Sequence, residues 1–424
     1  MENNMHLDIY EDRSVLHNHG KVTVFEEGTQ SQETNERYRK ITECLEAGYL
    51  DEVIINLSPV DYEDLADEKR IKLKALVDGI TSEVGRALVG LTVLQLTIKS
   101  IVPEQNIRLH KGSNFHSLFS WKNGLSMRTI DRKYNTPFLR KHDLLSLNRD
   151  GVFMTRSLAE NYPYSSLYKA KMRGPFKEWV EIVDEIELDS IPGKCGLCYL
   201  LTLLKNRTDT FKKLTEKAIN LAKAQKVYTL ENAQQLLQNF FNSTNYSARA
   251  FEVVVHSFLQ AMIECDYLEF NLIPISQMRS ANKKHGNIGD VELTDNNEII
   301  ESWDCKYGKP YLRDELEELK DKLMHHEGVK TAGFLVDSEI DLRKDIVQRT
   351  QDIGDMFGIN IKLMTFKEWV EFKTKKLNEK EKNLLGAKWL LATVESFGQK
   401  RPEIAPIDEP CDNWIEDLIM ILET

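Results

Sequence analysis

The stretch that most constrains the fold of this chain covers residues 288–308, with the sequence IGDVELTDNNEIIESWDCKYG. Polar and apolar residues alternate in DVEL, DNNE has the composition of a turn, and an apolar run restarts at Ile299. This pattern predicts two β-strands joined by a tight turn. Because side chains two apart on a strand share a face, Asp304 and Lys306 are expected on one side and Cys305 on the other.

Such a hairpin can bring three charged side chains together. Antiparallel pairing places Asp290, at the start of the first strand, beside Asp304 and Lys306 at the end of the second. Two carboxylates and one ammonium group at the edge of a sheet can hold a divalent metal ion and orient a water molecule. Glu292 shares a face with Asp290 in an ideal strand and is an alternative ligand. An isolated D-x-K is commonly a surface ion pair, so the prediction depends on the three residues together.

An aspartate followed, after about a dozen residues, by an acidic-x-Lys motif within a strand resembles the PD-(D/E)XK nucleases, which include many restriction endonucleases. Asp290 stands at the first acidic position, Asp304 at the second and Lys306 at the lysine. That family has a helix before these strands that often carries a glutamate near the site. The segment SARAFEVVVHSFLQAMIEC places Glu252 in that position, whereas Gly289 stands where the family name has proline.

The resemblance implies a metal-dependent endodeoxyribonuclease. It implies an α/β fold, α+β overall, with a restriction-endonuclease-like αβββαβ core in the C-terminal half and a helix-rich N-terminal region. Asp290, Asp304 and the backbone carbonyl of Cys305 would ligate Mg²⁺, with Mn²⁺ as a substitute. Lys306 would orient or deprotonate the attacking water, and Glu252 would support the water network or a second ion. Cleavage would leave 5′-phosphate and 3′-hydroxyl ends.

Three regions are predicted along the chain. Residues 1–244 form a helix-rich DNA-recognition region, residues 245–372 the catalytic core, and residues 373–424 C-terminal helices. The boundary before the core is placed at the polar segment NSTN. Residues 1–35 have little apolar content, so they are expected to form a loose arm or a small edge element.

The net charge of −11 is unevenly distributed, because residues 101–180 contain 14 Lys and Arg against 6 Asp and Glu, interleaved with aromatic residues. Charges farther apart than a Debye length of about 8 Å are largely screened, so local potential decides binding. We therefore expect this basic stretch to contact DNA, although a positively charged face is commonly only solvated surface. The basic residues expected at a DNA interface are Arg128, Arg132, Lys133, Arg140, Lys141, Arg156, Lys169, Lys171 and Arg173, with Lys283 and Lys284 shortly before Asp290.

The first residues, MENNMHLDIYEDRS, lack the basic and apolar regions of a signal peptide, and the most apolar run, residues 87–98, is interrupted by polar residues. Six cysteines in 424 residues do not form a disulfide scaffold, so the cytoplasm is the expected compartment. Cys195 and Cys198 have the spacing of a zinc knuckle, but no second motif completes it, which favours a buried helix.

These observations together predict a type II restriction endonuclease that cuts double-stranded DNA at a specific sequence and acts as a homodimer, with no membrane partner. A DNA methyltransferase acting on the same site is an expected partner. Two alternatives are a methylation-dependent or repair nuclease of the same fold, and a non-catalytic DNA-binding module on a degenerate nuclease fold. The joint presence of Asp290, Asp304 and Lys306 argues against the degenerate fold.

Overall fold

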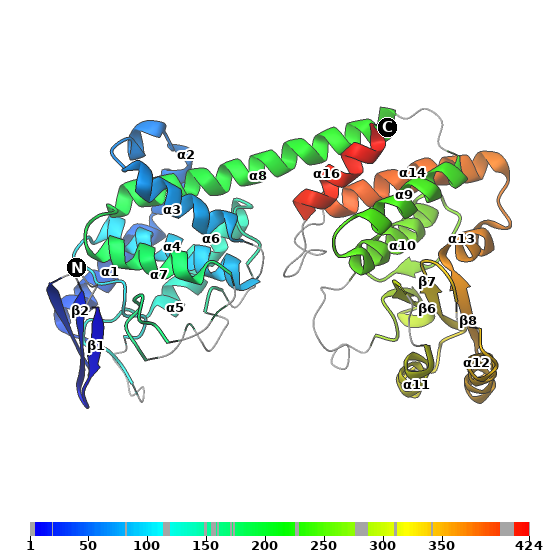
Figure 1. The fold of residues 1–424 in the computed structure, drawn as a ribbon, viewed down its shortest axis with the longest axis horizontal. Helices are drawn as coiled ribbons and strands as arrows, with labels where there is room; N and C mark the ends of the chain where they lie inside the picture. Colours follow the sequence, from blue (N-terminus) through cyan, green and yellow to red (C-terminus); the bar gives the residue numbers. More distant parts are fainter. Residues whose placement is uncertain are drawn as a thin grey trace. The chain divides into compact units, whose positions relative to one another are not determined.

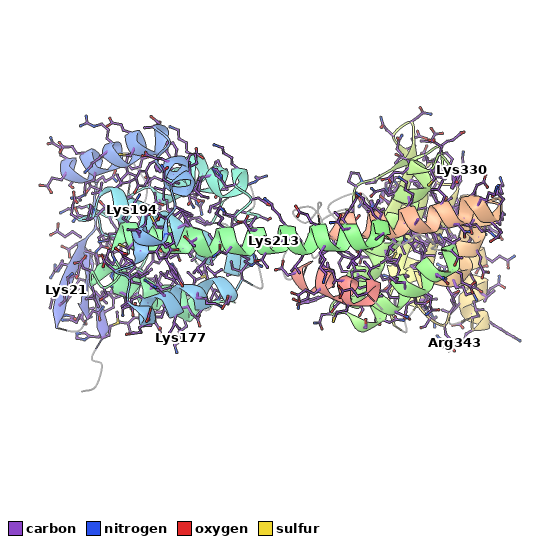
Figure 2. The ribbon with its side chains drawn as sticks, turned by 90° about the horizontal axis from the view of Figure 1, so that it is seen from above. Lys21, Lys177, Lys194, Lys213, Lys330 and Arg343 are labelled. Carbon is purple, nitrogen blue, oxygen red and sulfur yellow. The ribbon has the colours of Figure 1, made fainter. Side chains whose placement is uncertain are left out.

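The computed structural model describes residues 5–18, 20–80, 83–112, 119–147, 151–153, 158, 161–169, 172, 174–224, 229–275, 287–308, 312–340, 342–398 and 411–423. Its contacts divide the chain into two compact units, Met1–Thr210 and Phe211–Thr424 (Figure 1). The division falls inside helix α8 (Gly193–Ala224), which carries both Lys194 and Lys213 (Figure 2). Residues 211–244 therefore belong to the second unit, whereas the sequence grouped them with the N-terminal region. The α+β class is confirmed, since the helices accompany a five-stranded and a three-stranded sheet.

The first unit begins with a three-stranded antiparallel sheet rather than a loose arm or a small edge element. Its strands β1 (His6–Ile9), β2 (Arg13–Asn18) and β3 (Lys21–Glu26) pair in that order. Leu16 and Phe25 are buried and pack in one cluster with Trp121. The contact with Trp121, from a distant part of the chain, anchors the segment, whereas Ile9, Val22 and Val24 are exposed.

The helices of the first unit enclose a core around α4 (Glu83–Ile101). Of the segment Val84–Ile101, 83% is buried inside the protein. Among the helices of the described ranges, α4 alone is long and apolar enough to cross a membrane, and its burial is that of a core helix. The other helices are α1 (Gln32–Glu46), α2 (Tyr49–Ile55), η1 (Pro59–Tyr62), α3 (Asp67–Asp78), α5 (Met127–Ile130), η2 (Asp131–Asn135), α6 (Thr136–Lys141) and α7 (Phe176–Glu187).

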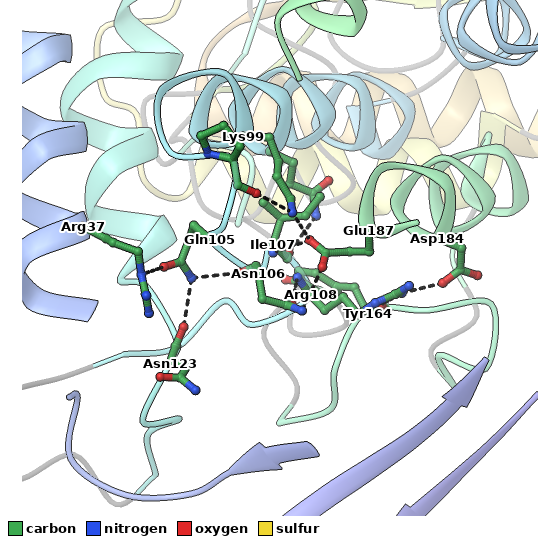
Figure 3. A network of polar contacts seen from close by, with 12 residues as sticks. Arg37, Lys99, Gln105, Asn106, Ile107, Arg108, Asn123, Tyr164, Asp184 and Glu187 are labelled. Carbon is green, nitrogen blue, oxygen red and sulfur yellow. Dashed lines mark hydrogen bonds and ion pairs between the residues drawn. The ribbon is translucent and has the colours of Figure 1, made fainter. Parts of the chain in front are cut away.

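Part of the basic stretch is built into this core. Arg108 is only 3% exposed, and its guanidinium contacts the Asp184 carboxylate and donates a 2.7 Å hydrogen bond to the Tyr164 carbonyl (Figure 3). In the same network Lys99 lies 3.1 Å from Glu187. Several aromatic residues of the stretch are buried as well, namely Trp121, Phe138, Tyr164 and Tyr168. A buried charge requires partners, so Arg108 stabilises the unit and does not belong to a binding surface.

The second unit is built on a mixed sheet with the order β4-β5-β6-β7-β8. Strands β4 (Asn271–Leu272), β5 (Val291–Asp295) and β6 (Glu298–Lys306) are antiparallel, and β7 (Thr331–Val336) and β8 (Asn360–Thr365) run parallel to β6. Strand β4 is short, and residues 276–286 lie outside the described ranges. Strands β5 and β6 form the hairpin that the sequence pattern predicted.

Helices cover both faces of this sheet (Figure 1). One apolar cluster contains Leu335 of β7, and a second contains Phe334 of the same strand, so successive residues of β7 are buried on opposite sides. The first cluster includes residues of α9 (Leu230–Ser243), α10 (Ser247–Glu264), α13 (Phe366–Thr374), α14 (Glu379–Gly398) and α16 (Cys411–Leu422). The second includes residues of α11 (Leu312–Leu323) and α12 (Lys344–Phe357).

Candidate active site

The turn between β5 and β6 sets the register of the candidate site. Asn296 and Asn297 adopt positive φ angles of 48° and 67°, which asparagine tolerates better than most residues. The pairing that follows places Val291 opposite Trp303. Directly before β5, the Asp290 amide donates a 2.9 Å hydrogen bond to the Trp303 carbonyl. The hairpin therefore carries Asp290 to the level of the end of β6.

Asp290, Asp304 and Lys306 meet at this end of the hairpin. The two carboxyl groups are hydrogen-bonded to each other, and Asp290 also accepts a 2.9 Å bond from the Cys305 amide. The Lys306 ammonium lies 3.1 Å from Asp304. Cys305 is buried in the apolar cluster on the opposite face, so the predicted alternation is present. The structure thus brings together the three residues that the sequence assigned to one site.

Glu252 borders this group from α10. It is 8% exposed, and its charge is close enough to raise the pKa of Asp290. The Arg249 guanidinium, one turn earlier on the helix, lies 2.5 Å from the Glu252 carboxylate. Arg249 was not singled out in the sequence, although its i,i+3 spacing from Glu252 is the signal that could have identified it. The pair keeps a carboxylate at the site while balancing its buried charge.

A further carboxylate at the site, Glu315, was missed in the sequence. It lies in the first turn of α11, and its Oε2 atom is 2.7 Å from the Lys306 ammonium. Lys306 is therefore held between Asp304 and Glu315. Helix α11 is rich in acidic residues, and the sequence alone does not distinguish which of them faces β6.

Burial and mutual proximity shift the titration of these groups. Burial, together with the neighbouring Asp290 carboxylate, raises the pKa of Asp304 to about 8. Burial and the charge of Glu252 likewise raise the pKa of Asp290. For Lys306, burial lowers the pKa, but the carboxylates Asp304 and Glu315 outweigh it and the net pKa is raised. The lysine is therefore charged at neutral pH.

The donors present fit a hard divalent cation. The carboxylates are Glu252, Asp290, Asp304 and Glu315, and the cations are Arg249 and Lys306. Fully ionised, this set carries two uncompensated negative charges, which explains why the adjacent aspartates retain a proton in the absence of an ion. Carboxylate and carbonyl oxygens are the ligands that Mg²⁺ prefers. Asp290, Asp304 and the Cys305 carbonyl are the groups that would hold it.

Glu292, the alternative ligand, has other partners. It lies opposite Ser302 in the register, and its Oε1 atom accepts hydrogen bonds from the amides of Ile288 at 2.6 Å and Gly289 at 3.1 Å. The Ser302 hydroxyl lies 3.3 Å from the same oxygen. These bonds fix the backbone just before Asp290. Glu292 therefore positions the segment that carries the first aspartate.

Close packing explains why glycine occupies position 289, where the family name has proline. A Cβ atom at Gly289 would lie 2.7 Å from both the Trp303 carbonyl oxygen and the Ser302 hydroxyl. Real Cβ atoms do not approach other atoms this closely, so a side chain here would push β5 away from β6. The departure from the family pattern leaves the carboxylates in place.

Five of the basic residues predicted at a DNA interface lie on one continuous helical segment, formed by α5, η2 and α6. They are Arg128, Arg132, Lys133, Arg140 and Lys141, and all five are exposed. Several of these side chains have partners within the protein. Lys133 lies 2.7 Å from Glu46, Lys141 lies 2.9 Å from Asp51, and Arg128 donates a 2.9 Å bond to a backbone carbonyl.

The remaining predicted interface residues are only partly described. Lys169 is exposed, with its ammonium 5.8 Å from the centre of the Tyr162 ring. Arg156, Lys171, Arg173, Lys283 and Lys284 lie outside the described residues. The structure therefore places one basic helical segment and Lys169 on the surface of the first unit.

No protein-family model matches this chain, and a search of curated proteins finds no match. The resemblance to the PD-(D/E)XK nucleases therefore stays a prediction from the sequence.

Proposed function

We propose that this protein is a Mg²⁺-dependent endonuclease that hydrolyses phosphodiester bonds of double-stranded DNA. The observation that carries the proposal is the convergence of Asp290, Asp304 and Lys306 at adjoining strand ends, with Glu252 supplied by the preceding helix. The order of elements supports it further. Helix α10, strands β4 to β6, helix α11 and strand β7 follow the αβββαβ order that the resemblance implies.

The residues at the site have separable tasks. Phosphodiester hydrolysis requires a barrier reduction on the order of 20 kcal/mol, to which a bound divalent ion contributes by neutralising phosphate charge and activating water. Asp290 and Asp304 would hold that ion at the end of the β5–β6 hairpin. Lys306 is kept charged by Asp304 and Glu315, so it donates hydrogen bonds to the attacking water or to a phosphate oxygen. Because a protonated lysine cannot accept a proton, the orienting role is favoured over the role of a base.

Sequence-specific cleavage of the restriction type is the form of this activity that we propose. The first unit is a separate compact body with an exposed basic helical segment, and such a segment can contact DNA phosphates. A homodimer would supply one active site for each strand of a palindrome, and products would carry 5′-phosphate and 3′-hydroxyl ends. Light scattering after size-exclusion chromatography measures the oligomeric state, and mapping the ends of a digested DNA of known sequence reveals the recognition site.

A cleavage assay on plasmid DNA tests the activity. The parent protein is expected to cut with Mg²⁺ or Mn²⁺ and to be inactive with EDTA. Asp304→Ala and Lys306→Ala are expected to reduce the rate by at least about 10²-fold, the scale for removing one electrostatic group from an active site. Asp295→Ala and Lys330→Ala remove exposed charges elsewhere in this unit and serve as matched controls (Figure 2).

Two outcomes would contradict the assignment. Cleavage by Asp304→Ala or Lys306→Ala at the rate of the parent would show that the hydrolysis occurs elsewhere. DNA binding by the parent without cleavage, in any divalent metal and on DNA of any methylation state, would favour a non-catalytic module.

A further inference from the structure

We propose that the N-terminal sheet carries a binding site for a divalent transition-metal ion of the zinc class. Its ligands are His6 and Asp8 of β1 and His17 of β2. In the antiparallel register His6 stands opposite His17, and Asp8 follows His6 by two residues, so all three side chains share one face of the sheet. This site lies in the first unit and is independent of the proposed nuclease activity.

Two of the three distances between the ligand atoms approach those around a small tetrahedral ion. Nε2 of His17 lies 3.4 Å and Nε2 of His6 3.7 Å from the same Oδ2 atom of Asp8, and all three ligand atoms lie within 4.8 Å of one another. Zinc bonds of about 2.0–2.1 Å at tetrahedral angles separate neighbouring ligand atoms by about 3.3–3.4 Å. The two histidine–aspartate distances therefore already come within a few tenths of an ångström of this requirement.

The two imidazole rings are stacked face to face across neighbouring strands. Their centres are 4.1 Å apart and their planes differ by 9°. For both Nε2 lone pairs to converge on one ion, the rings must tilt toward each other. The side chains of His6 and His17 are 55% and 34% exposed, so rotation about their side-chain torsions meets little resistance and an ion can enter from solvent. Water would complete the coordination.

The chemistry of the donors separates this site from the one at Asp290. Two imidazole nitrogens with one carboxylate oxygen suit Zn²⁺ and its transition-metal neighbours, whereas Mg²⁺ requires oxygen ligands. The position of the three ligands on β1 and β2 indicates how a bound ion would affect the sheet. Strand β2 is the central strand and is anchored through Leu16, whereas β1 is a four-residue edge strand. An ion ligated by both strands would join the edge strand to the anchored one.

Zinc binding to the full-length, metal-free protein tests the proposal. Competition against a chromophoric chelator, with excess Mg²⁺ present to occupy oxygen-lined sites, gives the stoichiometry and affinity. His6→Ala and His17→Ala are each expected to weaken the binding of one zinc equivalent at least tenfold. His325→Ala, which removes an exposed histidine of the second unit, is expected to leave it unchanged. Co²⁺ is expected to give a visible absorption band that His17→Ala abolishes.

The competing outcomes are distinguishable. Equal zinc affinity and stoichiometry in the parent and in His17→Ala would overturn the proposal, as would a loss of the same size in His325→Ala. Circular dichroism melts of the metal-free variants establish that they are folded, since the substituted side chains are exposed. Zinc is expected to raise the melting temperature of the parent but not that of His17→Ala. A protein that binds zinc in this way but never cleaves DNA would refute the nuclease proposal alone.

Discussion

Two lysine side chains lie on opposite faces of β6 and have different surroundings. Lys306 stands at the strand end between two carboxylates, Asp304 and Glu315. Lys373 of α13 is 8% exposed and pairs with Glu301, whose side chain is on the face opposite Asp304. Burial lowers the pKa of Lys373, although Glu301 partly offsets this. We therefore expect Lys306 to serve the proposed hydrolysis and Lys373 to stabilise the fold.

Replacing each lysine in turn separates these roles. Lys306→Ala is expected to lose cleavage and to lower the free energy of unfolding less than Lys373→Ala does, because the Lys306 side chain is 23% exposed and that of Lys373 only 8%. Lys373→Ala leaves Glu301 buried without its partner and is expected to destabilise the protein by about 3 kcal/mol. Urea unfolding and cleavage rates measured well below the unfolding transition provide the comparison. A folded Lys373→Ala that cannot cleave would contradict this division.

The aspartate pair makes the stability of the metal-free protein depend on pH. The pKa of Asp304 is raised from its ordinary value of 3.8 to about 8 in the folded chain, because of burial and the nearby Asp290. The stabilising effect of the protonated form is thus complete below the ordinary value and is lost as the pH rises through about 8. Stability is expected to fall across this window.

Asp304→Asn should remove this dependence. At pH 9 without metal the variant is expected to melt several degrees above the parent, given about 2–4 °C per kcal/mol for a unit of this size. Mg²⁺ should raise the melting temperature of the parent at that pH and leave the variant unaffected. Scanning calorimetry from pH 5 to pH 9 measures both effects. A variant that melts below the parent at pH 9 would show that the aspartate is stabilising when charged.

At the scale of elements, the sequence pattern predicts those structures that are determined by residues close together in the chain. The alternation in DVEL and the asparagines of the turn predicted the β5–β6 hairpin and its register, and with it the meeting of Asp290 and Asp304. Strand β7 is likewise a short apolar run bounded by polar residues, which is typical of a strand covered on both faces. These features depend on neighbours in sequence.

Features that depend on distant contacts were not predictable in this way. The N-terminal sheet is ordered by Trp121, which lies far along the chain from Leu16 and Phe25. Helix α8 continues without a break from an apolar first half into an amphipathic second half, so no single repeating pattern predicts its full length. Likewise, only the packing of α11 onto the sheet selects Glu315 among several acidic residues.

The Arg249–Glu252 pair on α10 provides a test at this scale. Arg249→Ala leaves a carboxylate buried beside Asp290 and is expected to cost about 3–5 kcal/mol of unfolding free energy. Combining it with Glu252→Gln should recover part of that loss, because the unpaired charge is then removed. A double-mutant cycle from urea unfolding measures the coupling. If the two losses simply add, the pair is not the interaction that balances Glu252.

For the whole molecule, the proposed function requires a chain of net charge −11 to bind DNA. The exposed helical segment formed by α5, η2 and α6 provides a local excess of positive charge, but Lys133 and Lys141 are paired with Glu46 and Asp51. Exposed ion pairs contribute only about 0–1 kcal/mol. A phosphate can therefore replace either carboxylate at little cost in stability.

The salt dependence of DNA binding tests whether phosphates replace these carboxylates. Each lost phosphate contact should reduce the slope of log K against log salt by about 0.9, so an Arg140→Ala and Lys141→Ala double variant is expected to lower it by up to about 2. Binding is measured with EDTA or Ca²⁺, which separates it from Mg²⁺-dependent cleavage. Lys177→Ala and Lys194→Ala remove two exposed lysines from other helices of the same unit and form the matched control (Figure 2). Because both double variants lose the same net charge, a general charge effect would change both slopes alike, whereas direct contact through the basic segment changes only the first.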